Sequence, residues 1–172
     1  MPLPLGDTRW SELQASYGGT ADVVAWLRQA YETRSPSAEL IGNLINEVQH
    51  QGDTSTAMYA VAVHFVALAR DASPACAVHL LTSAGMTYAD SSRDDAAPCP
   101  AFLEHEFRSF AVEGARLLAS HVATMSDFPT FKYAVAALAG FEGHHAFGRL
   151  IANLDYFEGR FHHPSLDEPI SE

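Results

Sequence analysis

Apolar residues recur at helical spacing along almost the whole chain, and no segment has the alternating pattern of a half-buried strand. Between residues 58 and 68, for example, apolar side chains at positions 58, 61, 62, 65 and 68 define one face of a helix. Further helix starts are marked by a capping residue followed by proline, at Ser35–Pro36, Ser73–Pro74 and Asp127–Phe128–Pro129. The pattern predicts an all-α protein.

The predicted helices are joined by short connections, which favour antiparallel neighbours. We expect helices over residues 8–17, 20–35, 36–51, 55–70, 74–85, 102–122, 129–139 and 144–154. Gly52 is expected to stop the third of them. One domain over residues 1–172 is predicted, with an irregular loop near 86–100 and a frayed tail from about 157. The hairpins suggest a short HEAT-like α-solenoid, and a compact helical bundle is the alternative because no exact repeat is present.

The charge balance is strongly acidic, with a formal net charge of −11, 21 acidic side chains and a single lysine. Phosphate backbones would be repelled by this charge, so we expect no nucleic-acid ligand and no DNA glycosylase activity. The N-terminus has no basic segment followed by an apolar one, and no stretch approaches the roughly 18 apolar residues of a membrane span. We therefore expect a cytoplasmic protein without a membrane partner.

Residues 39–71 contain an apolar helix, a His50-Gln51-Gly52 junction and a second apolar helix rich in small residues. This segment resembles small bacterial HEAT-like repeat proteins, although His64 stands near a position where that family often has proline. A weaker similarity covers residues 107–140. The family resemblance implies an interaction scaffold, and some such proteins are immunity proteins encoded beside toxins. It therefore implies a binding role with a protein partner, most specifically a toxin. Acidic side chains on the concave face of stacked hairpins would suit a basic toxin domain such as a nuclease. The junction residues also have a structural interpretation, because they can close the end of a helix.

Acidic side chains are densest in and after the predicted loop, at Asp90, Asp94, Asp95, Glu104 and Glu106. Such a cluster suits a basic protein partner. The alternative is an ordinary solvated loop. These five residues are the predicted partner-binding surface.

Two Glu-x-x-His spacings, Glu47 to His50 and Glu142 to His145, offer a different function. On a helix, residues three apart share a face, and the ferritin-like di-iron site combines two such pairs with one glutamate from each of two other helices. Glu32 and Glu113 could supply these. A di-metal carboxylate protein or oxidoreductase is therefore the alternative function, although Gly143 interrupts the second motif and the helices look short for it.

No catalytic residue and no cofactor are predicted, because the chain lacks a nucleophile elbow, a phosphate loop and a dinucleotide-binding turn. His64, His79 and His121 fall on largely apolar helices and are interpreted as core histidines. Cys76 and Cys99 lack the spacing of a metal site and are interpreted as buried thiols. A purely structural subunit that self-associates is a third possible role.

Overall fold

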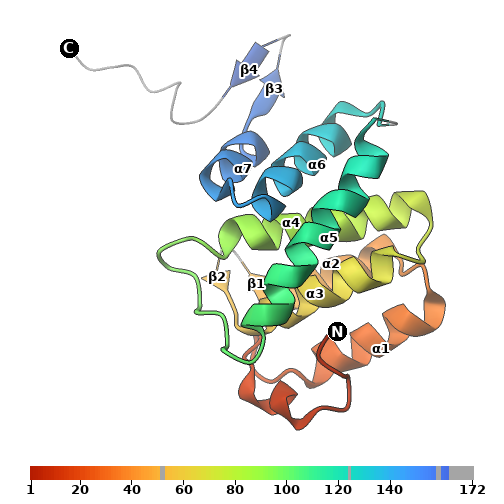
Figure 1. Cartoon of the computed structure of the whole chain (residues 1–172), viewed down its shortest axis with the longest axis vertical. Helices are drawn as coiled ribbons and strands as arrows, with labels where there is room; N and C mark the ends of the chain where they lie inside the picture. Colours follow the sequence, from red (N-terminus) through yellow and green to blue (C-terminus); the bar gives the residue numbers. More distant parts are fainter. Residues whose placement is uncertain (51–52, 124, 158–159, 163–172) are drawn as a thin grey trace.

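The computed structural model describes residues 1–50, 53–123, 125–157 and 160–162 (Figure 1). Within these ranges the chain forms one 3-10 helix, seven α-helices and two short antiparallel strand pairs, so the all-α prediction is confirmed. The helices are η1 (Thr8–Glu12), α1 (Ala21–Thr33), α2 (Ala38–Val48), α3 (Ala57–Ala69), α4 (Pro74–Asp90), α5 (Glu104–Val122), α6 (Phe128–Phe141) and α7 (His145–Ala152). The strand pairs are β1 (Gln49–His50) with β2 (Asp53–Thr54), and β3 (Asp155–Phe157) with β4 (Arg160–His162). None of the helices in the described part of the chain has the length and apolar composition that a bilayer crossing needs.

The helices follow one another through the molecule from α1 at one end to α6 and α7 at the other (Figure 1). α3 packs against α2, α4 and α5, and α4 packs against α3 on one side and α6 on the other. α5 crosses this arrangement and contacts α3, α4 and α6. α4 and α5 therefore link the two halves of the fold.

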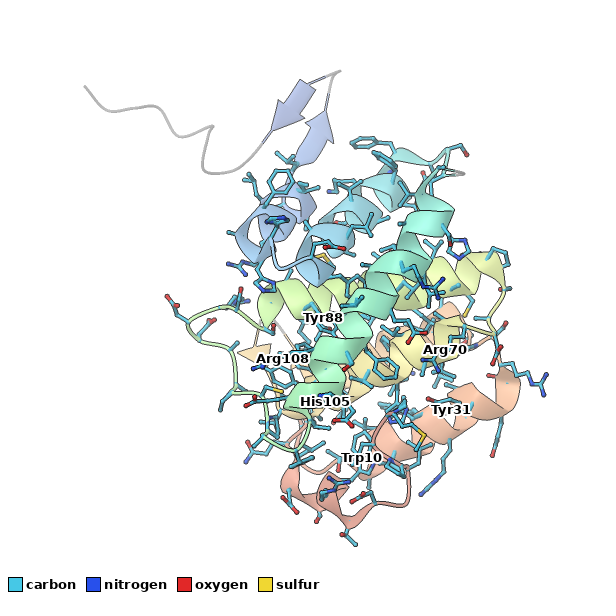
Figure 2. All side chains as sticks on the ribbon, viewed as in Figure 1. Trp10, Tyr31, Arg70, Tyr88, His105 and Arg108 are labelled. Carbon is cyan, nitrogen blue, oxygen red and sulfur yellow. The ribbon has the colours of Figure 1, made fainter. Side chains whose placement is uncertain are left out.

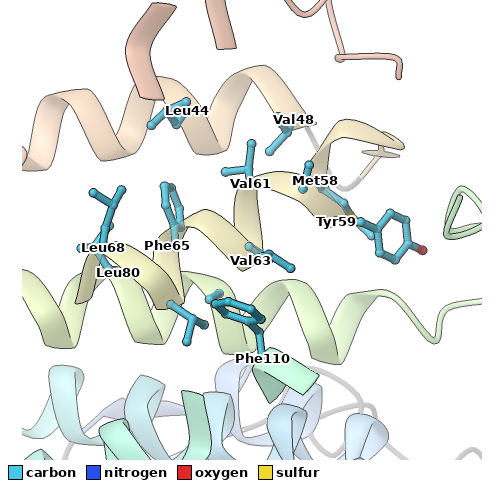
Figure 3. Close-up of a cluster of buried hydrophobic side chains, with 14 of the residues drawn as sticks. Leu44, Val48, Met58, Tyr59, Val61, Val63, Phe65, Leu68, Leu80 and Phe110 are labelled. Atoms are coloured by element: carbon cyan, nitrogen blue, oxygen red, sulfur yellow. The ribbon is translucent and has the colours of Figure 1, made fainter. Parts of the chain in front are cut away.

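α3 is the centre of the hydrophobic core. Every residue of this helix except Ala67 is buried, which is why its sequence is apolar on all sides rather than on one stripe. Figure 3 shows its side chains between Leu44 and Val48 of α2 and Phe110 of α5. Burial of a valine, leucine, phenylalanine or methionine side chain contributes about 1.5–3 kcal/mol to the free energy of unfolding. The burial of α3 therefore contributes much of the stability of the fold.

The boundaries of α2 differ from the prediction at both ends. Its N-cap is Ser37, whose hydroxyl oxygen accepts from the Leu40 amide at 3.1 Å, and not Ser35. The helix ends at Val48 rather than at Gly52. The Val48 carbonyl is taken by Ser55, whose amide donates to it at 3.1 Å and whose hydroxyl donates at 2.8 Å. This bonding to the start of α3 replaces the last helical turn.

The predicted loop over residues 86–100 begins too early. α4 continues to Asp90, because Thr87, Tyr88 and Ala89 are buried. The Tyr88 ring stacks on Phe107 with centroids 3.8 Å apart, and its hydroxyl donates to the Phe107 carbonyl. This long-range contact with α5 extends the helix into a segment whose composition resembles a loop.

The remaining predictions concern the starts of α4 and α6, the first helix and the C-terminal segment. The caps at Ser73 and Asp127 are confirmed, with proline in the first turn of α4 and α6 and an Asp127 carboxylate that accepts from the Thr130 amide at 2.9 Å. The predicted helix over 8–17 is only the short 3-10 helix η1. β3 pairs with β4 at the start of the segment for which a frayed tail is predicted. Residues 158–159 and 163–172 lie outside the described ranges.

His64 of α3 fixes the N-terminal segment to the core. Its Nε2 lies 2.9 Å from the Leu3 carbonyl oxygen and its Nδ1 lies 2.9 Å from the Tyr31 hydroxyl. Trp10 stacks on the same ring, and Figure 2 places Trp10 and Tyr31 together at the α1 end of the molecule. The prediction of a core histidine is confirmed for His64, which is 2% exposed.

Candidate binding groove

A groove of about 710 Å³ opens beside α4. Its floor is one face of α4, where Ala75, His79, Thr82 and Met86 follow at helical spacing. The opposite face of the same helix is buried in the core through Ala77, Leu80, Leu81, Ala84 and Tyr88. One face of α4 therefore packs in the core, and the other faces the groove.

The walls of the groove come from segments far apart in the sequence. Ile45 and Gln49 form one wall, at the end of α2 and the start of β1. The other wall is formed by the end of α5, the connection after it and the first turns of α6. Its lining residues are His121, Met125, Pro129, Thr130 and Tyr133. Ser35 helps to hold α2 beside α4, since its hydroxyl oxygen accepts from the Ser73 amide at 3.2 Å.

The lining is largely apolar, and none of its residues in the described part of the chain is aspartate, glutamate, lysine or arginine. Burial lowers the pKa of His79 below its ordinary value, so this side chain is mainly neutral at neutral pH. Met86 and Met125 add flexible, polarisable side chains that adapt to different apolar surfaces. The Tyr133 ring is 42% exposed at the rim. His79 and His121 were predicted as core residues, but both line this groove.

A smaller, polar cavity of about 440 Å³ adjoins the groove. It is lined by Met86, Asp90, Arg93, Arg149, Ala152 and Asn153. Met86 lines both spaces, and the side chain amide of Gln49, a groove residue, donates to the Asp90 carboxylate. Burial raises the pKa of Asp90, while the Gln49 hydrogen bond and the arginine charges act in the opposite direction. The two cavities thus meet at Met86 and at the Gln49–Asp90 pair.

Both arginines of the polar cavity donate hydrogen bonds to other residues of the chain. Nη1 of Arg149 donates to the Ala89 carbonyl and, at 2.9 Å, to the Ser92 hydroxyl, so this side chain closes the C-terminal end of α4. Arg93 forms two bonds with Asp95, at 2.9 and 2.7 Å. Within the described residues, neither arginine forms a salt bridge with Asp90.

The five acidic residues predicted to bind a partner do not share one environment. Asp90 is half-buried in the polar cavity and Asp94 is exposed. Asp95 pairs with Arg93, which lowers the pKa of Asp95. Glu104 pairs at 3.1 Å with Arg108, which lies near the start of α5 (Figure 2). Glu106 lies 4.0 Å from the N-terminal amine. Three of the five charges are therefore balanced by cations of the same chain.

The six residues of the metal-site hypothesis come from six different places. Glu32 lies on α1 and Glu47 on α2, whereas His50 belongs to β1, so the first Glu-x-x-His spacing does not lie within one helix. The second does not either, because Glu142 follows α6 and His145 begins α7. Glu113 is engaged by Arg70 through bonds of 2.6 and 2.5 Å. Across the described ranges, no three His, Cys, Asp or Glu side chains are grouped to hold a metal ion.

The remaining predicted residues are placed as follows. His50 of the family junction lies in β1, while Gln51 and Gly52 are outside the described residues. Cys76 and Cys99 are half-buried thiols rather than fully buried ones. Burial, with the nearby Glu104 charge, raises the pKa of Cys99 to about 11, so this thiol stays protonated at neutral pH.

No family model matches the chain, and the searches of curated proteins and of solved structures found no match. The similarity of residues 39–71 to HEAT-like repeat proteins therefore stays a prediction.

Proposed function

We propose that this chain is a binding protein that receives an apolar segment of a protein partner in the groove along α4. The observation that carries the proposal is the groove itself, a solvent-accessible space of about 710 Å³. Among the residues that the structure describes, its lining contains no Asp, Glu, Lys or Arg. Apolar surface of this kind is costly to leave in water and favours an apolar occupant. Two methionines and a rim tyrosine are side chains that protein interfaces favour.

The arrangement of helices supports this role. α1 with α2, α3 with α4 and α6 with α7 can be interpreted as successive hairpins of a short HEAT-like solenoid, in which α5 crosses the stack. Stacked hairpins leave an elongated binding surface along one side. In this interpretation the groove lies on such a side, since α2, α4 and α6 supply most of its lining and the end of α5 the rest of one wall.

The charge of the chain points to a basic partner. A net charge of −11 accelerates association with a positively charged protein over distances of about a Debye length, near 10 Å at moderate salt. The groove then supplies the short-range apolar contact. An immunity protein that neutralises a basic toxin domain by direct binding combines both features, and it agrees with the similarity of residues 39–71.

Co-expression with the product of the adjacent gene tests this function. We expect that product to arrest growth when it is expressed alone, and this chain to restore growth and to co-purify with it. A neighbour that is harmless and does not co-purify would contradict the immunity role.

A tryptophan in the floor of the groove should block binding. Ser83 and Ser109 are matched positions, because each lies in a helix and donates its hydroxyl to the carbonyl four residues earlier at 2.9 Å. Ser83 lines the groove, whereas Ser109 is exposed on α5 away from its lining. We expect Ser83→Trp to weaken partner binding at least about tenfold and Ser109→Trp to change it less than about twofold, as measured by titration calorimetry.

Equal binding by both tryptophan variants would exclude the groove as the contact surface. A melting temperature for each variant separates lost binding from lost folding. Growth rescue that fails only with Ser83→Trp would link the groove to the neutralising activity.

A further inference from the structure

The apolar groove and the polar cavity are parts of one surface. Met86 contributes to both linings, and Gln49 joins them by its bond to Asp90. An occupant that lies on the α4 floor and continues past Met86 would meet Asp90 and Arg149. The chemistry of these two residues restricts what the occupant can be.

Asp90 and Arg149 retain hydrogen-bonding capacity toward the cavity. A carboxylate has about four acceptor positions, and the Gln49 amide occupies one of those of Asp90. In Arg149 only Nη1 donates to the chain among the described residues, which leaves the N–H groups of Nε and Nη2. One side of the cavity can thus accept a hydrogen bond while another side donates one.

The charges around this cavity cancel. Arg93 is paired with Asp95, which lies outside the lining, and the other two lining charges, Asp90 and Arg149, oppose each other. A ligand with a net charge therefore gains little from entering. The complementary group is neutral and carries a donor and an acceptor together. A peptide bond is such a group, because its N–H can donate to Asp90 while its C=O accepts from Arg149.

We infer that the groove and the polar cavity together bind an extended peptide segment, with an apolar side chain on the α4 floor and a backbone amide between Asp90 and Arg149. This inference rests on the proposed function, since it specifies the form in which the partner is recognised. Backbone hydrogen bonds supply affinity in such complexes and the pocket for a side chain supplies selectivity.

The four methionines give a direct test with a phage-displayed library of random peptides as the probe. Met86 and Met125 line the groove, Met58 is fully buried in the core, and Met1 is exposed at the N-terminus. In protein labelled at the methionine methyl groups, the selected peptides should shift the NMR signals of Met86 and Met125 and leave those of Met58 and Met1 in place. The selected sequences should share an apolar residue and no fixed charge.

Asp90→Ala and Asp94→Ala form a matched pair, since both remove one negative charge and the two positions are close in sequence. We expect the selected peptides to bind Asp90→Ala at least about tenfold more weakly and Asp94→Ala within about twofold of the original chain. Peptides that shift neither Met86 nor Met125, that require a conserved charge, or that bind both variants equally would overturn the inference, as would a library without binders. Because these measurements do not use the adjacent gene product, peptide binding without a toxin complex would reject only the immunity role.

Discussion

Gly140→Ala should destabilise the protein by about 3 kcal/mol or more. A Cβ atom at this position would overlap the Gly85 carbonyl oxygen and lie 3.0 Å from the Ala89 amide nitrogen. Both groups belong to the backbone of α4, so the clash cannot be relieved by a side-chain rotation. α6 must move away from α4, and the buried contacts between these helices are lost with it.

A matched glycine provides the control. Gly42 also lies within a helix, α2, but a Cβ there would meet nothing within 4 Å. Gly42→Ala should therefore stabilise the protein by about 0.5–1 kcal/mol through helix propensity. Urea unfolding followed by circular dichroism measures both effects, and a Gly140→Ala variant within about 1 kcal/mol of the original chain would contradict the crossing described here.

The same crossing positions the groove. α4 supplies the floor and the start of α6 supplies one wall, so their separation fixes the width of the space. Small residues lie on both sides of the crossing, since a Cβ at Gly85 would meet Ala137 atoms at 2.5 to 2.8 Å. Spreading of these helices should therefore impair binding as well as stability, even where the fold survives.

Much of the fold is visible in local sequence signals. The starts of α4 and α6 follow from Ser73 and Asp127, because capping and proline chemistry depend on neighbouring residues only. The end of α2 does not, because Ser55 competes for the Val48 carbonyl from outside the helix. Tyr88 extends α4 in the same non-local way, through its contact with Phe107.

The candidate site was less accessible to sequence analysis than the fold. Its lining runs from Ile45 to Tyr133 and assembles only when α2, α4, the end of α5 and α6 come together. Of the five acidic residues predicted for partner binding, Asp90 lines the adjoining cavity, and its burial depends on the extension of α4. A second stripe on α4, through His79, Thr82 and Met86, was the available signal. This stripe was not recognised as a surface because a histidine on an apolar helix was assumed to belong to the core.

The second large effect concerns acid stability and arises from His64. The Leu3 carbonyl can only accept, so Nε2 of His64 carries the proton, and Nδ1 then accepts from the Tyr31 hydroxyl. This arrangement needs a neutral ring. Burial lowers the pKa of His64 to about 4, although the hydrogen bond to Leu3 acts in the opposite direction.

The direction of the pH effect follows from proton binding. In the unfolded chain the pKa of a histidine is near 6.5, so between about pH 6.5 and pH 4 the unfolded state binds a proton that the folded state excludes. Folding stability should fall by about 1.4 kcal/mol per pH unit over this window, and by on the order of 3 kcal/mol in total. The stability contributed by the neutral ring is complete above this window and is lost as the pH falls through it.

His64→Gln isolates this contribution. A glutamine amide can still donate toward the Leu3 carbonyl and accept from the Tyr31 hydroxyl, but it does not titrate. Between about pH 7 and pH 5 we expect the original chain to lose about 2 kcal/mol more stability than His64→Gln, measured by urea unfolding at each pH. Because His79 and His145 are unchanged in both proteins, equal acid sensitivity of His64→Gln and the original chain would show that the ring of His64 accepts a proton without loss of the fold.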